Sequence, residues 1–207
     1  PRILIAGCGT GQQSISTAST FKNSTVLSVD LSLPSLAYAK RKTEELGLQN
    51  IEYILGDILN LEEIGRRFDI IESVGVLHHM EDPMVGWKVL CNCLEQGGLM
   101  KIGLYSQLAR DYVVKVRNEI KESKQEINDS TIRTLRNRAM NSAEDHHIQL
   151  RNFSDFYSLS EFRDLVFHVQ EHRFNLPQIK NCLAELGLKF CGFEQPPFIE
   201  QFKRVYS

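Results

Sequence analysis

Three glycines near the N-terminus alternate with other residues in a spacing that suits ligand binding. An apolar run at residues 2–6 leads directly into Gly7, Gly9 and Gly11. Glycine lets the backbone turn sharply and leaves no side chain where a ligand must lie against the main chain. The segment therefore predicts a loop that holds a nucleotide-type cofactor.

A carboxylate follows at a matching distance. Asp30 comes directly after a second apolar run, residues 25–29, and lies nineteen residues after Gly11. A carboxylate at the end of the second strand of such a unit can accept hydrogen bonds from two ribose hydroxyls. A tight strand-to-helix connection without a ligand would explain the glycines alone, but the glycines together with Asp30 favour a ribose-containing cofactor.

The glycine spacing distinguishes between cofactors. Dinucleotide-binding loops have the pattern G-x-G-x-x-G, and Gln12 stands where the third glycine of that pattern would be. The observed pattern is G-x-G-x-G. The third glycine of the dinucleotide pattern lies inside the helix whose N-terminus holds the pyrophosphate, so its absence argues against NAD.

These residues must be positioned by alternating strands and helices. Short apolar runs rich in Ile, Leu and Val predict strands at residues 2–6, 25–29, 51–55, 68–73 and 99–105. Helices are expected from Pro34 to Glu45 and from Pro83 to a point before Gly97. This alternation predicts an α/β fold with a doubly wound, mostly parallel sheet, whose ligands bind beyond the carboxyl ends of the strands.

The alternation of predicted strands and helices stops after Tyr105. Residues 106–175 predict a largely helical insertion or lid, with helices at 106–123 and 131–141, and a helix starting at Pro177 and a strand at 188–193 then resume the core pattern. We therefore predict a cofactor-binding core at 1–105 and 176–195, the insertion at 106–175, and a C-terminal extension at 196–207. Because the chain opens on Pro1 directly ahead of a strand, we expect it to be a fragment of a longer protein.

Four segments in this order resemble the class I S-adenosylmethionine-dependent methyltransferases. They are the glycine loop with Asp30, the segment 54–58 around Asp57, the segment 68–79, and the segment 94–99. The resemblance implies a Rossmann-like methyltransferase fold and S-adenosyl-L-methionine as the cofactor. It implies that Asp57 accepts from the adenine amino group and that Ile58 donates a backbone N–H. Capping of a following helix is the alternative role for Asp57.

The resemblance also implies which other residues surround the cofactor. The loop after the fourth strand would pass the methionine and methyl end. The predicted cofactor-binding residues are Gly7, Cys8, Gly9, Gly11, Asp30, Leu31, Asp57, Ile58, Ser73 and Val74. For Cys8 itself packing is favoured over nucleophilic chemistry, because nothing near it in sequence would activate the thiol.

Catalytic groups are expected at the strand ends. A sulfonium methyl is already activated, so the protein mainly has to place a nucleophile in line and exclude water. Four side chains are the candidates for deprotonating a weak nucleophile: Glu72, His78, His79 and Tyr105. A neutral imidazole could take a proton near physiological pH, and the equal alternative is that one histidine only hydrogen-bonds the loop backbone.

Two patterns that could bind metal are set aside. Residues 168–172 fit H-x-x-E-H, a pattern of some zinc peptidases, but a peptidase site would contradict everything before it. We expect this segment to fold over the cofactor mouth instead. Cys91 and Cys93 lie two residues apart on a predicted helix and so point to different faces. No metal site is predicted.

Composition and net charge limit the classes of partner that the protein is expected to bind. The net charge of −2 over 207 residues lacks the basic excess that nucleic-acid or membrane surfaces usually carry. Five cysteines, an odd number, indicate a reducing cytoplasm rather than a disulfide framework. No apolar stretch reaches the length of a membrane span. We predict a cytoplasmic protein with no membrane partner, and nucleic acid is disfavoured.

A narrower resemblance concerns the protein's longer form. The segments 104–106, 165–168 and 174–177 are similar to those of bacterial methyltransferases that carry tetratricopeptide repeats upstream. This implies a tetratricopeptide-repeat region before residue 1. The sequence thus predicts methyl transfer to an unidentified acceptor, with protein or small molecule favoured. An NAD-dependent oxidoreductase and a non-catalytic scaffold that binds S-adenosylmethionine are the alternatives.

Overall fold

A computed structural model describes residues 1–123, 126, 128–167, 170–194 and 196–206 of the chain. These residues form two compact units, Pro1–Asn175 and Leu176–Ser207. Each unit is treated by itself below. Within the described residues, none of the helices combines the length and the apolar character needed to cross a membrane.

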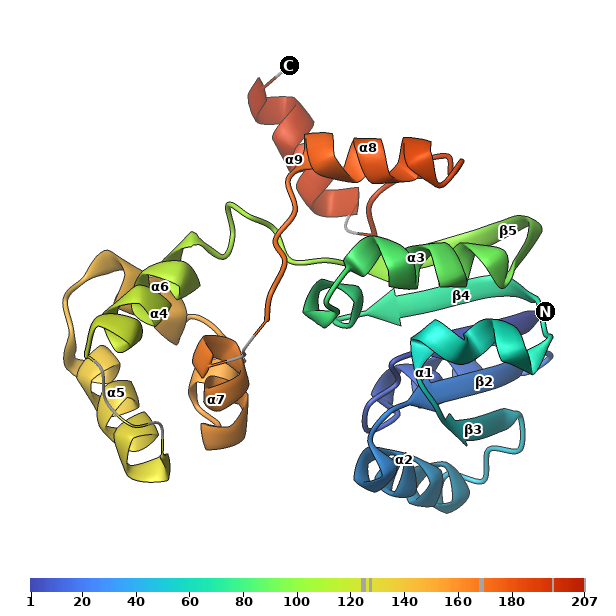
Figure 1. The fold of residues 1–207 in the computed structure, drawn as a ribbon, viewed down its shortest axis with the longest axis horizontal. Helices are drawn as coiled ribbons and strands as arrows, with labels where there is room; N and C mark the ends of the chain where they lie inside the picture. The colour runs from blue at the N-terminus through green and yellow to red at the C-terminus, as the bar shows by residue number, and fades with distance from the viewer. Residues whose placement is uncertain (124–125, 127, 168–169, 195, 207) are drawn as a thin grey trace. The chain divides into compact units, whose positions relative to one another are not determined.

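The first unit is built on a five-stranded sheet with the strand order β3-β2-β1-β4-β5 (Figure 1). The strands are β1 (Arg2–Ala6), β2 (Thr25–Asp30), β3 (Ile51–Leu55), β4 (Phe68–Val74) and β5 (Leu94–Gly103). Every neighbouring pair is parallel. The predicted α/β fold with a parallel sheet is confirmed.

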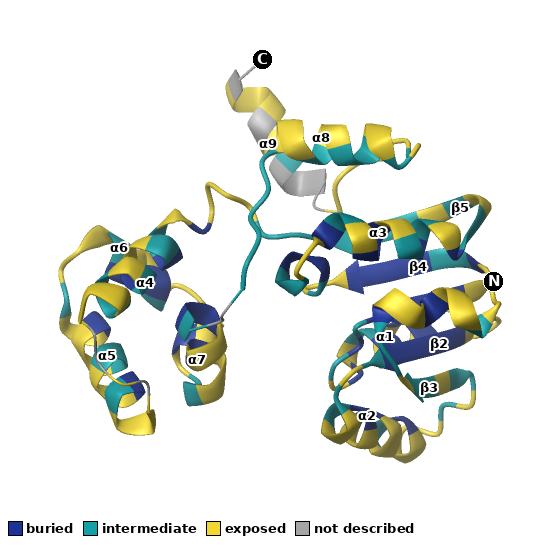
Figure 2. Ribbon diagram, viewed as in Figure 1, coloured by how far each residue is buried: buried dark blue, intermediate teal, exposed yellow. Residues whose placement is uncertain are grey.

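Burial follows position in the sheet. The central strands β1, β2 and β4 are mostly buried, whereas the edge strands β3 and β5 are partly exposed (Figure 2). A strand covered on both faces must be apolar along its whole length, which is why the sequence shows continuous rather than alternating apolar runs there. One buried cluster on the sheet combines Ile3 and Ile5 of β1 with Val26 of β2 and Leu36 of the following helix.

Three α-helices and two short 3₁₀ helices connect the strands. They are α1 (Gln12–Thr20), α2 (Leu33–Glu45), η1 (Ile58–Ile64), η2 (Leu77–His79) and α3 (Pro83–Asn92). Right-handed crossovers require α1 and α2 on one face of the sheet and η1 and α3 on the other. Side-chain caps fix two starts: Ser32 accepts from the Ser35 N–H and Asp82 from the Met84 N–H. Each cap precedes a proline in the first helical turn, as the sequence indicated.

Strand β5 differs from its prediction at both ends. The strand begins at Leu94 and ends at Gly103, instead of covering 99–105. Gly97 and Gly98 do not form a turn before the strand. They lie at an irregularity within it, because the strand pairing passes from Phe68↔Leu94 to Ile70↔Leu99. Gly98 permits this close approach, since a Cβ there would lie 2.9 Å from the Asp69 carbonyl oxygen.

The region after β5 is helical, as predicted. Its elements are α4 (Asp111–Ser123), α5 (Asp129–Asn141), α6 (Asp145–Arg151), η3 (Ser154–Phe156) and α7 (Leu159–Phe167). They enclose a hydrophobic cluster of their own that includes Val113, Ile132, Leu150, Phe156 and Phe162. The insertion can therefore hold its helices together through its own core.

Helix α4 starts five residues later than the sequence suggested. Ser106 is paired in a parallel bridge with Phe174, and residues 107–110 form a turn before Asp111. The bridge is flanked by two backbone hydrogen bonds, Phe174 N–H to the Tyr105 carbonyl at 2.8 Å and Gln107 N–H to the Phe174 carbonyl at 2.9 Å. A partner some seventy residues away in sequence takes up backbone groups that a helix would have used.

The second unit contains α8 (Leu176–Glu185) and α9 (Pro196–Tyr206). The strand predicted at 188–193 is wrong: these residues are irregular, and all but the half-buried Leu188 are exposed. Gly192 has φ +141, and the Phe190 and Phe193 rings contact each other with centroids 5.0 Å apart. An apolar segment becomes a strand only if a neighbouring strand accepts its hydrogen bonds, and no such pairing is formed within the described residues.

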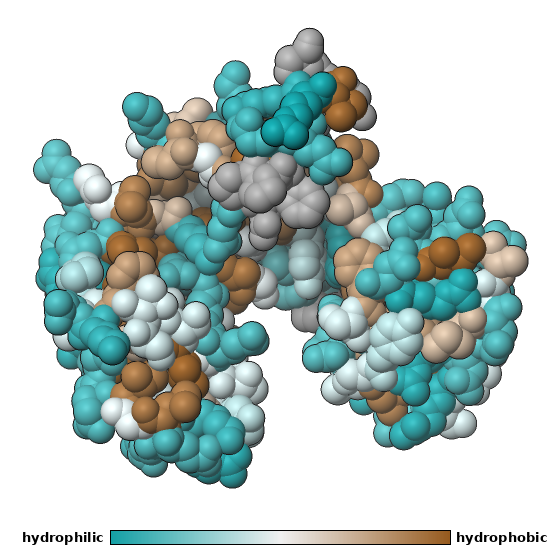
Figure 3. Space-filling view, turned by 180° about the vertical axis from the view of Figure 1, so that it is seen from behind, coloured by the Kyte–Doolittle hydropathy of each residue, from teal (hydrophilic) through white to brown (hydrophobic). Residues whose placement is uncertain are grey.

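The surface is mixed in character. In the space-filling view, hydrophobic residues form separate patches among hydrophilic ones (Figure 3).

Candidate cofactor and acceptor site

The glycine loop adopts a backbone that only glycine accepts easily. Gly7, Gly9 and Gly11 have φ values of +80°, +53° and +84°. A Cβ on Gly7 would lie 2.2 Å from a Val76 methyl, and one on Gly11 would lie 2.6 Å from the Ala39 Cβ. At Gly9 nothing lies within 4 Å. Gly7 and Gly11 therefore serve packing and turn geometry, whereas the Gly9 backbone faces open space that a ligand can occupy.

Asp30 is bound directly to this loop. Its Oδ2 accepts from the Gly9 N–H at 2.7 Å and its Oδ1 accepts from the Ser32 N–H at 2.8 Å. The Gly7 and Cys8 N–H groups both donate to the Val29 carbonyl, at 2.8 and 3.0 Å. The loop after β1 is thus held against the end of β2. The two features that the sequence paired across nineteen residues meet in the structure.

Cys8 is buried in the core beneath the loop, as predicted. Burial, followed by the nearby Asp30 carboxylate, raises the pKa of the thiol to about 12. A thiol that stays protonated at physiological pH is a poor nucleophile.

The remaining predicted cofactor residues lie at or near the carboxyl ends of the strands. Leu31 is 71% exposed directly after Asp30, and Val74 at the end of β4 is also exposed. Ser73 and Ile58 are buried. Asp57 caps η1, since its Oδ1 accepts from the Leu59 N–H at 2.9 Å. This confirms the capping role, while adenine recognition by Asp57 stays a prediction.

The rings of His78, His79 and Tyr105 form a cluster of tilted and edge-to-face contacts. The ring centroids of His78 lie 3.8 Å from Tyr105 and 4.2 Å from His79. His78 is fully buried between them. Burial, and next the neighbouring His79, lowers the pKa of His78 to about 4, so its ring is neutral at physiological pH. His78 is thus a buried neutral ring that contacts the other two, and its catalytic role stays a prediction.

A short returning segment, residues 170–174, holds the His79 ring. The His79 Nδ1 lies 3.0 Å from the Gln170 carbonyl oxygen, which can only accept, so this nitrogen carries the proton in the neutral ring. The His172 N–H donates to the His78 carbonyl at 2.7 Å, and the Gln170 amide donates to the Met80 carbonyl at 3.3 Å. The segment was expected to fold over the cofactor mouth, and its described part contacts the loop after β4.

A buried ionic network anchors the same segment. The Glu171 carboxylate is 2% exposed and accepts from Arg110 at 2.5 Å and from Arg117 at 3.0 Å. The Arg110 guanidinium also lies over the Tyr105 ring, 3.9 Å from its centroid. Burial by itself would raise the pKa of Glu171, but the arginines outweigh it and hold the pKa below its ordinary value. Glu171 is therefore the anion of this network. Its pattern partner His168 lies outside the described residues.

Glu72, the fourth catalytic candidate, lies inside the sheet. The residue pairs with Ile5 and Lys101 inside the sheet, two positions before the end of β4. Its carboxylate contacts Gln13 and lies 3.3 Å from the Thr17 hydroxyl, both on α1. Side chains alternate between the faces of a strand, and position 72 falls on the face that α1 covers.

The free cysteines give no shared site. All five are unpaired as thiols, and Cys93 is buried whereas Cys91 is partly exposed. The two side chains thus differ in environment, as their spacing predicted.

A cavity of about 420 Å³ opens beside His79 and Tyr105. It is lined by residues of the loop after β4, the end of β5 and the helical region: Gly75, His79, Tyr105, Asp155, Glu161, Asp164 and Leu165. Three of these side chains are acidic, and none of the lining residues in the described part of the chain is Lys or Arg. A cavity of this kind attracts a cationic group and repels an anionic one.

Sequence reasoning missed the acidic residues of this cavity and both arginines of the network. Glu161 and Asp164 lie three residues apart on α7, which places them on one helix face. That spacing could have been recognised in the sequence as an acidic helix face. Asp155 and Arg110 offered none, because their neighbours are set by the packing of helices far apart in sequence.

Residues 3–98, which span the sheet from β1 into β5, match the family described as the methyltransferase domain. Over these residues the chain is similar to a methyltransferase domain. The match covers the glycine loop, Asp30, Asp57 and the His78–His79 loop, and it stops before the helical region.

Curated relatives extend beyond the chain. An uncharacterized protein of Synechococcus sp. is 28% identical over 205 residues, 93% of this chain, and the chain spans 48% of that protein's length. A probable (S)-tetrahydroprotoberberine N-methyltransferase 2 of Papaver bracteatum is 30% identical over 98 residues, 47% of this chain and 27% of that protein. The chain thus spans about half the length of the first of these relatives and a smaller part of the second.

A solved structure has the same fold throughout. The structure of PKMT2 from Rickettsia typhi in complex with AdoHcy superposes with a TM-score of 0.72 at 18% identity, over 100% of this chain and 44% of that one. At this identity the likeness shows the fold alone. It covers the helical region as well as the sheet.

Proposed function

We propose that the protein binds S-adenosyl-L-methionine at the carboxyl edge of the sheet and transfers its methyl group to a nucleophile in the acidic cavity. The observation that carries the proposal is the Gly9 backbone, which faces open space while its N–H is fixed to Asp30 at 2.7 Å. A cradle of this shape, in a methyltransferase domain, fits the cofactor of that family.

The residues present suit each part of the cofactor. Asp30 offers a carboxylate to the ribose hydroxyls, and the exposed Leu31 beside it offers an apolar surface for the adenine ring. Asp57 and Ile58 are proposed at the adenine edge. Ser73 and Val74, at the end of β4, are proposed near the methionine end, together with Gly7, Cys8 and Gly11 of the loop.

The chemistry needs little from the protein. The bound cofactor supplies an activated sulfonium methyl group. The cavity residues hold the acceptor, and the returning segment 170–174 holds the His79 ring at the cavity wall. With its proton on Nδ1, His79 presents Nε2 as the nitrogen that can accept a proton from the acceptor. Tyr105 supplies a wall that keeps the acceptor in place.

An amine is the acceptor that this cavity fits best. Asp155, Glu161 and Asp164 attract an ammonium group, and His79 can remove the proton that blocks its lone pair. The same acidic lining disfavours nucleic acid, whose phosphates are anionic. The relative from Papaver bracteatum is named an N-methyltransferase, which agrees with an amine acceptor. The amine can be carried by a small molecule or by a protein.

The organisation of the longer protein is also a proposal. We infer a core formed by residues 1–105 and 176–195, with 106–175 as the acceptor-side insertion and 196–207 as an extension. The similarity to tetratricopeptide-repeat methyltransferases suggests a repeat region upstream that would bring a partner to the cavity.

A binding and transfer experiment tests this function. Calorimetric titration with S-adenosylmethionine and NAD should show binding of the first only. Label transfer from methyl-labelled cofactor should then be measured with matched amine, alcohol and thiol acceptors and with RNA. We expect labelled amines. Cofactor binding without labelled product from any acceptor or cell extract would instead support a non-catalytic scaffold.

A paired substitution tests the acidic cavity. Glu161→Gln with Asp164→Asn should raise KM for the amine several-fold at low salt and leave cofactor affinity unchanged, because two attractive charges are lost. Glu122→Gln, an exposed acid at the end of α4, is the control for net charge. An equal rise of KM in the control would contradict a specific role for the cavity.

A further inference from the structure

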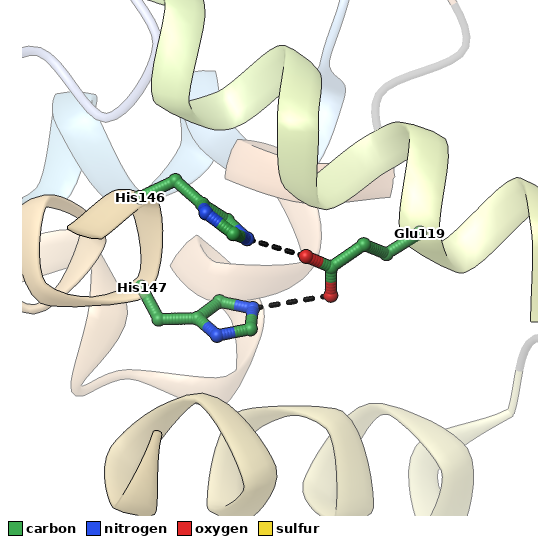
Figure 4. Close-up of side chains that lie close together, drawn as sticks. All are labelled: Glu119, His146 and His147. Carbon is green, nitrogen blue, oxygen red and sulfur yellow. Dashed lines mark hydrogen bonds and ion pairs between the residues drawn. The ribbon is translucent and has the colours of Figure 1, made fainter. Parts of the chain in front are cut away.

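A second set of chemically active side chains lies in the helical region, between α4 and α6. Glu119 of α4 points at two consecutive histidines of α6, His146 and His147 (Figure 4). One ligand atom from each residue lies within 4.8 Å of the others. None of the three belongs to the cofactor loop or lines the acidic cavity.

The contacts converge on one carboxylate. The His146 Nε2 contacts Glu119 Oε1, and the His147 Nε2 lies 3.3 Å from Glu119 Oε2. Two imidazole nitrogens and a carboxylate form a donor set that zinc and related ions bind. Two ligand atoms at zinc-binding distance on a tetrahedral ion lie about 3.3 Å apart, so the His147–Glu119 separation already suits an ion between them.

We propose that Glu119, His146 and His147 bind a divalent transition-metal ion, with Zn²⁺ the ion that this donor set fits best. Three protein ligands leave the fourth position to water. The ion would fasten the start of α6 to α4.

The burial of His147 supports a ligand. The residue is 3% exposed, and its Nδ1 has no hydrogen-bond partner in the described part of the chain. A buried histidine that serves only packing ordinarily has both nitrogens satisfied. The Nε2 of His147 is the nitrogen that faces Glu119, so this atom is the one that a metal ion between them would meet.

The opposite side of the cluster gives access. The side chains of His146 and Glu119 are 16% and 30% exposed. Arg138 lies 3.7 Å from Glu119 Oε2, but its side chain is largely exposed and can move aside, because a surface ion pair of this kind contributes only about 0–1 kcal/mol. An ion can therefore enter without unfolding the helices.

The test uses metal-stripped protein and the metals alone. Zn²⁺ should bind with a stoichiometry of one in calorimetry and raise the midpoint of thermal unfolding, whereas Mg²⁺ should do neither. Co²⁺ should give a tetrahedral visible spectrum without thiolate-to-cobalt charge transfer, which separates this site from the five cysteines.

Matched variants decide the location. Glu119→Gln and His146→Gln should each weaken Zn²⁺ binding at least about tenfold. Glu122→Gln, on the same helix, should not. Circular dichroism of each variant without metal checks that the fold is kept. Absence of Zn²⁺ binding to the unaltered protein would overturn the proposal, as would unchanged affinity in both variants or an equal loss in Glu122→Gln.

Discussion

The replacement Asp30→Asn tests the link between the glycine loop and the cofactor. Both carboxylate oxygens accept backbone N–H groups, from Gly9 at 2.7 Å and from Ser32 at 2.8 Å. An asparagine side chain keeps one oxygen and puts an NH₂ donor in place of the other. One of the two backbone donors then loses its acceptor.

The expected magnitudes follow from these contacts. A hydrogen bond to a charged group contributes about 1.5–3 kcal/mol, so the free energy of unfolding should fall by about that amount. The ribose hydroxyls would also lose one charged acceptor. We expect the affinity for S-adenosylmethionine to fall by about 10- to 100-fold, since 1.4 kcal/mol corresponds to a factor of ten.

Calorimetry and urea unfolding measure both effects, with Asp69→Asn as the control. The Asp69 carboxylate also accepts a backbone N–H, that of Arg2 at 2.7 Å, but at the opposite end of the sheet. The control should lose some stability and keep its cofactor affinity. Unchanged affinity in Asp30→Asn, or equal losses in both variants, would refute the assignment of Asp30 to the ribose.

Three further predictions concern single residues. Gly9→Ala should cost about 1–2 kcal/mol of stability, because alanine disfavours a φ of +53°, and should weaken cofactor binding. Gly7→Ala should unfold the loop, because its new methyl group would collide with Val76. Calorimetry and thermal unfolding distinguish the two variants. His78→Phe should flatten the pH dependence of stability between pH 6.5 and 4. The folded pKa of about 4 lies below the ordinary 6.5. The stability that the neutral ring provides is therefore full above pH 6.5 and is lost toward pH 4, by on the order of 3 kcal/mol. Urea unfolding measures this across the range, and parallel stability curves for the variant and the unaltered protein would contradict the prediction. Glu171→Gln should destabilise the protein by about 3–5 kcal/mol, because it leaves Arg110 and Arg117 buried without an anion. The lowered pKa of Glu171 means that this stability is present above the ordinary carboxyl pKa and is lost as pH falls through the folded value; an unaltered acid transition in the variant would contradict that role.

The sheet and the cofactor loop were readable because their signals are local. The strands β1 to β4 follow from continuous apolar runs, and the glycine loop follows from the conformations that only glycine adopts at residues 7, 9 and 11. The pairing with Asp30 was also readable, since a right-handed crossover brings the end of the second strand beside the end of the first.

The errors share a physical cause. An expected helix at Ser106 gave way to a bridge with Phe174, and an expected strand at 188–193 found no neighbouring strand to pair with. The side chain of Glu72 likewise faces α1 because of its position in the register, while its catalytic role stays a prediction. In each case the outcome depended on a partner distant in sequence.

The sequence by itself determined the parallel sheet, the glycine cradle and the type of cofactor, because these depend on backbone conformation and on contacts along one crossover. Only the tertiary structure decided which histidine lines the cavity and which is buried beside it. It alone brought Asp155, Glu161 and Asp164 to the end of β4, and Glu119 to the histidines of α6. Such groupings depend on how helices pack through apolar side chains, and polar residues that packing brings together from different helices share no spacing in the sequence.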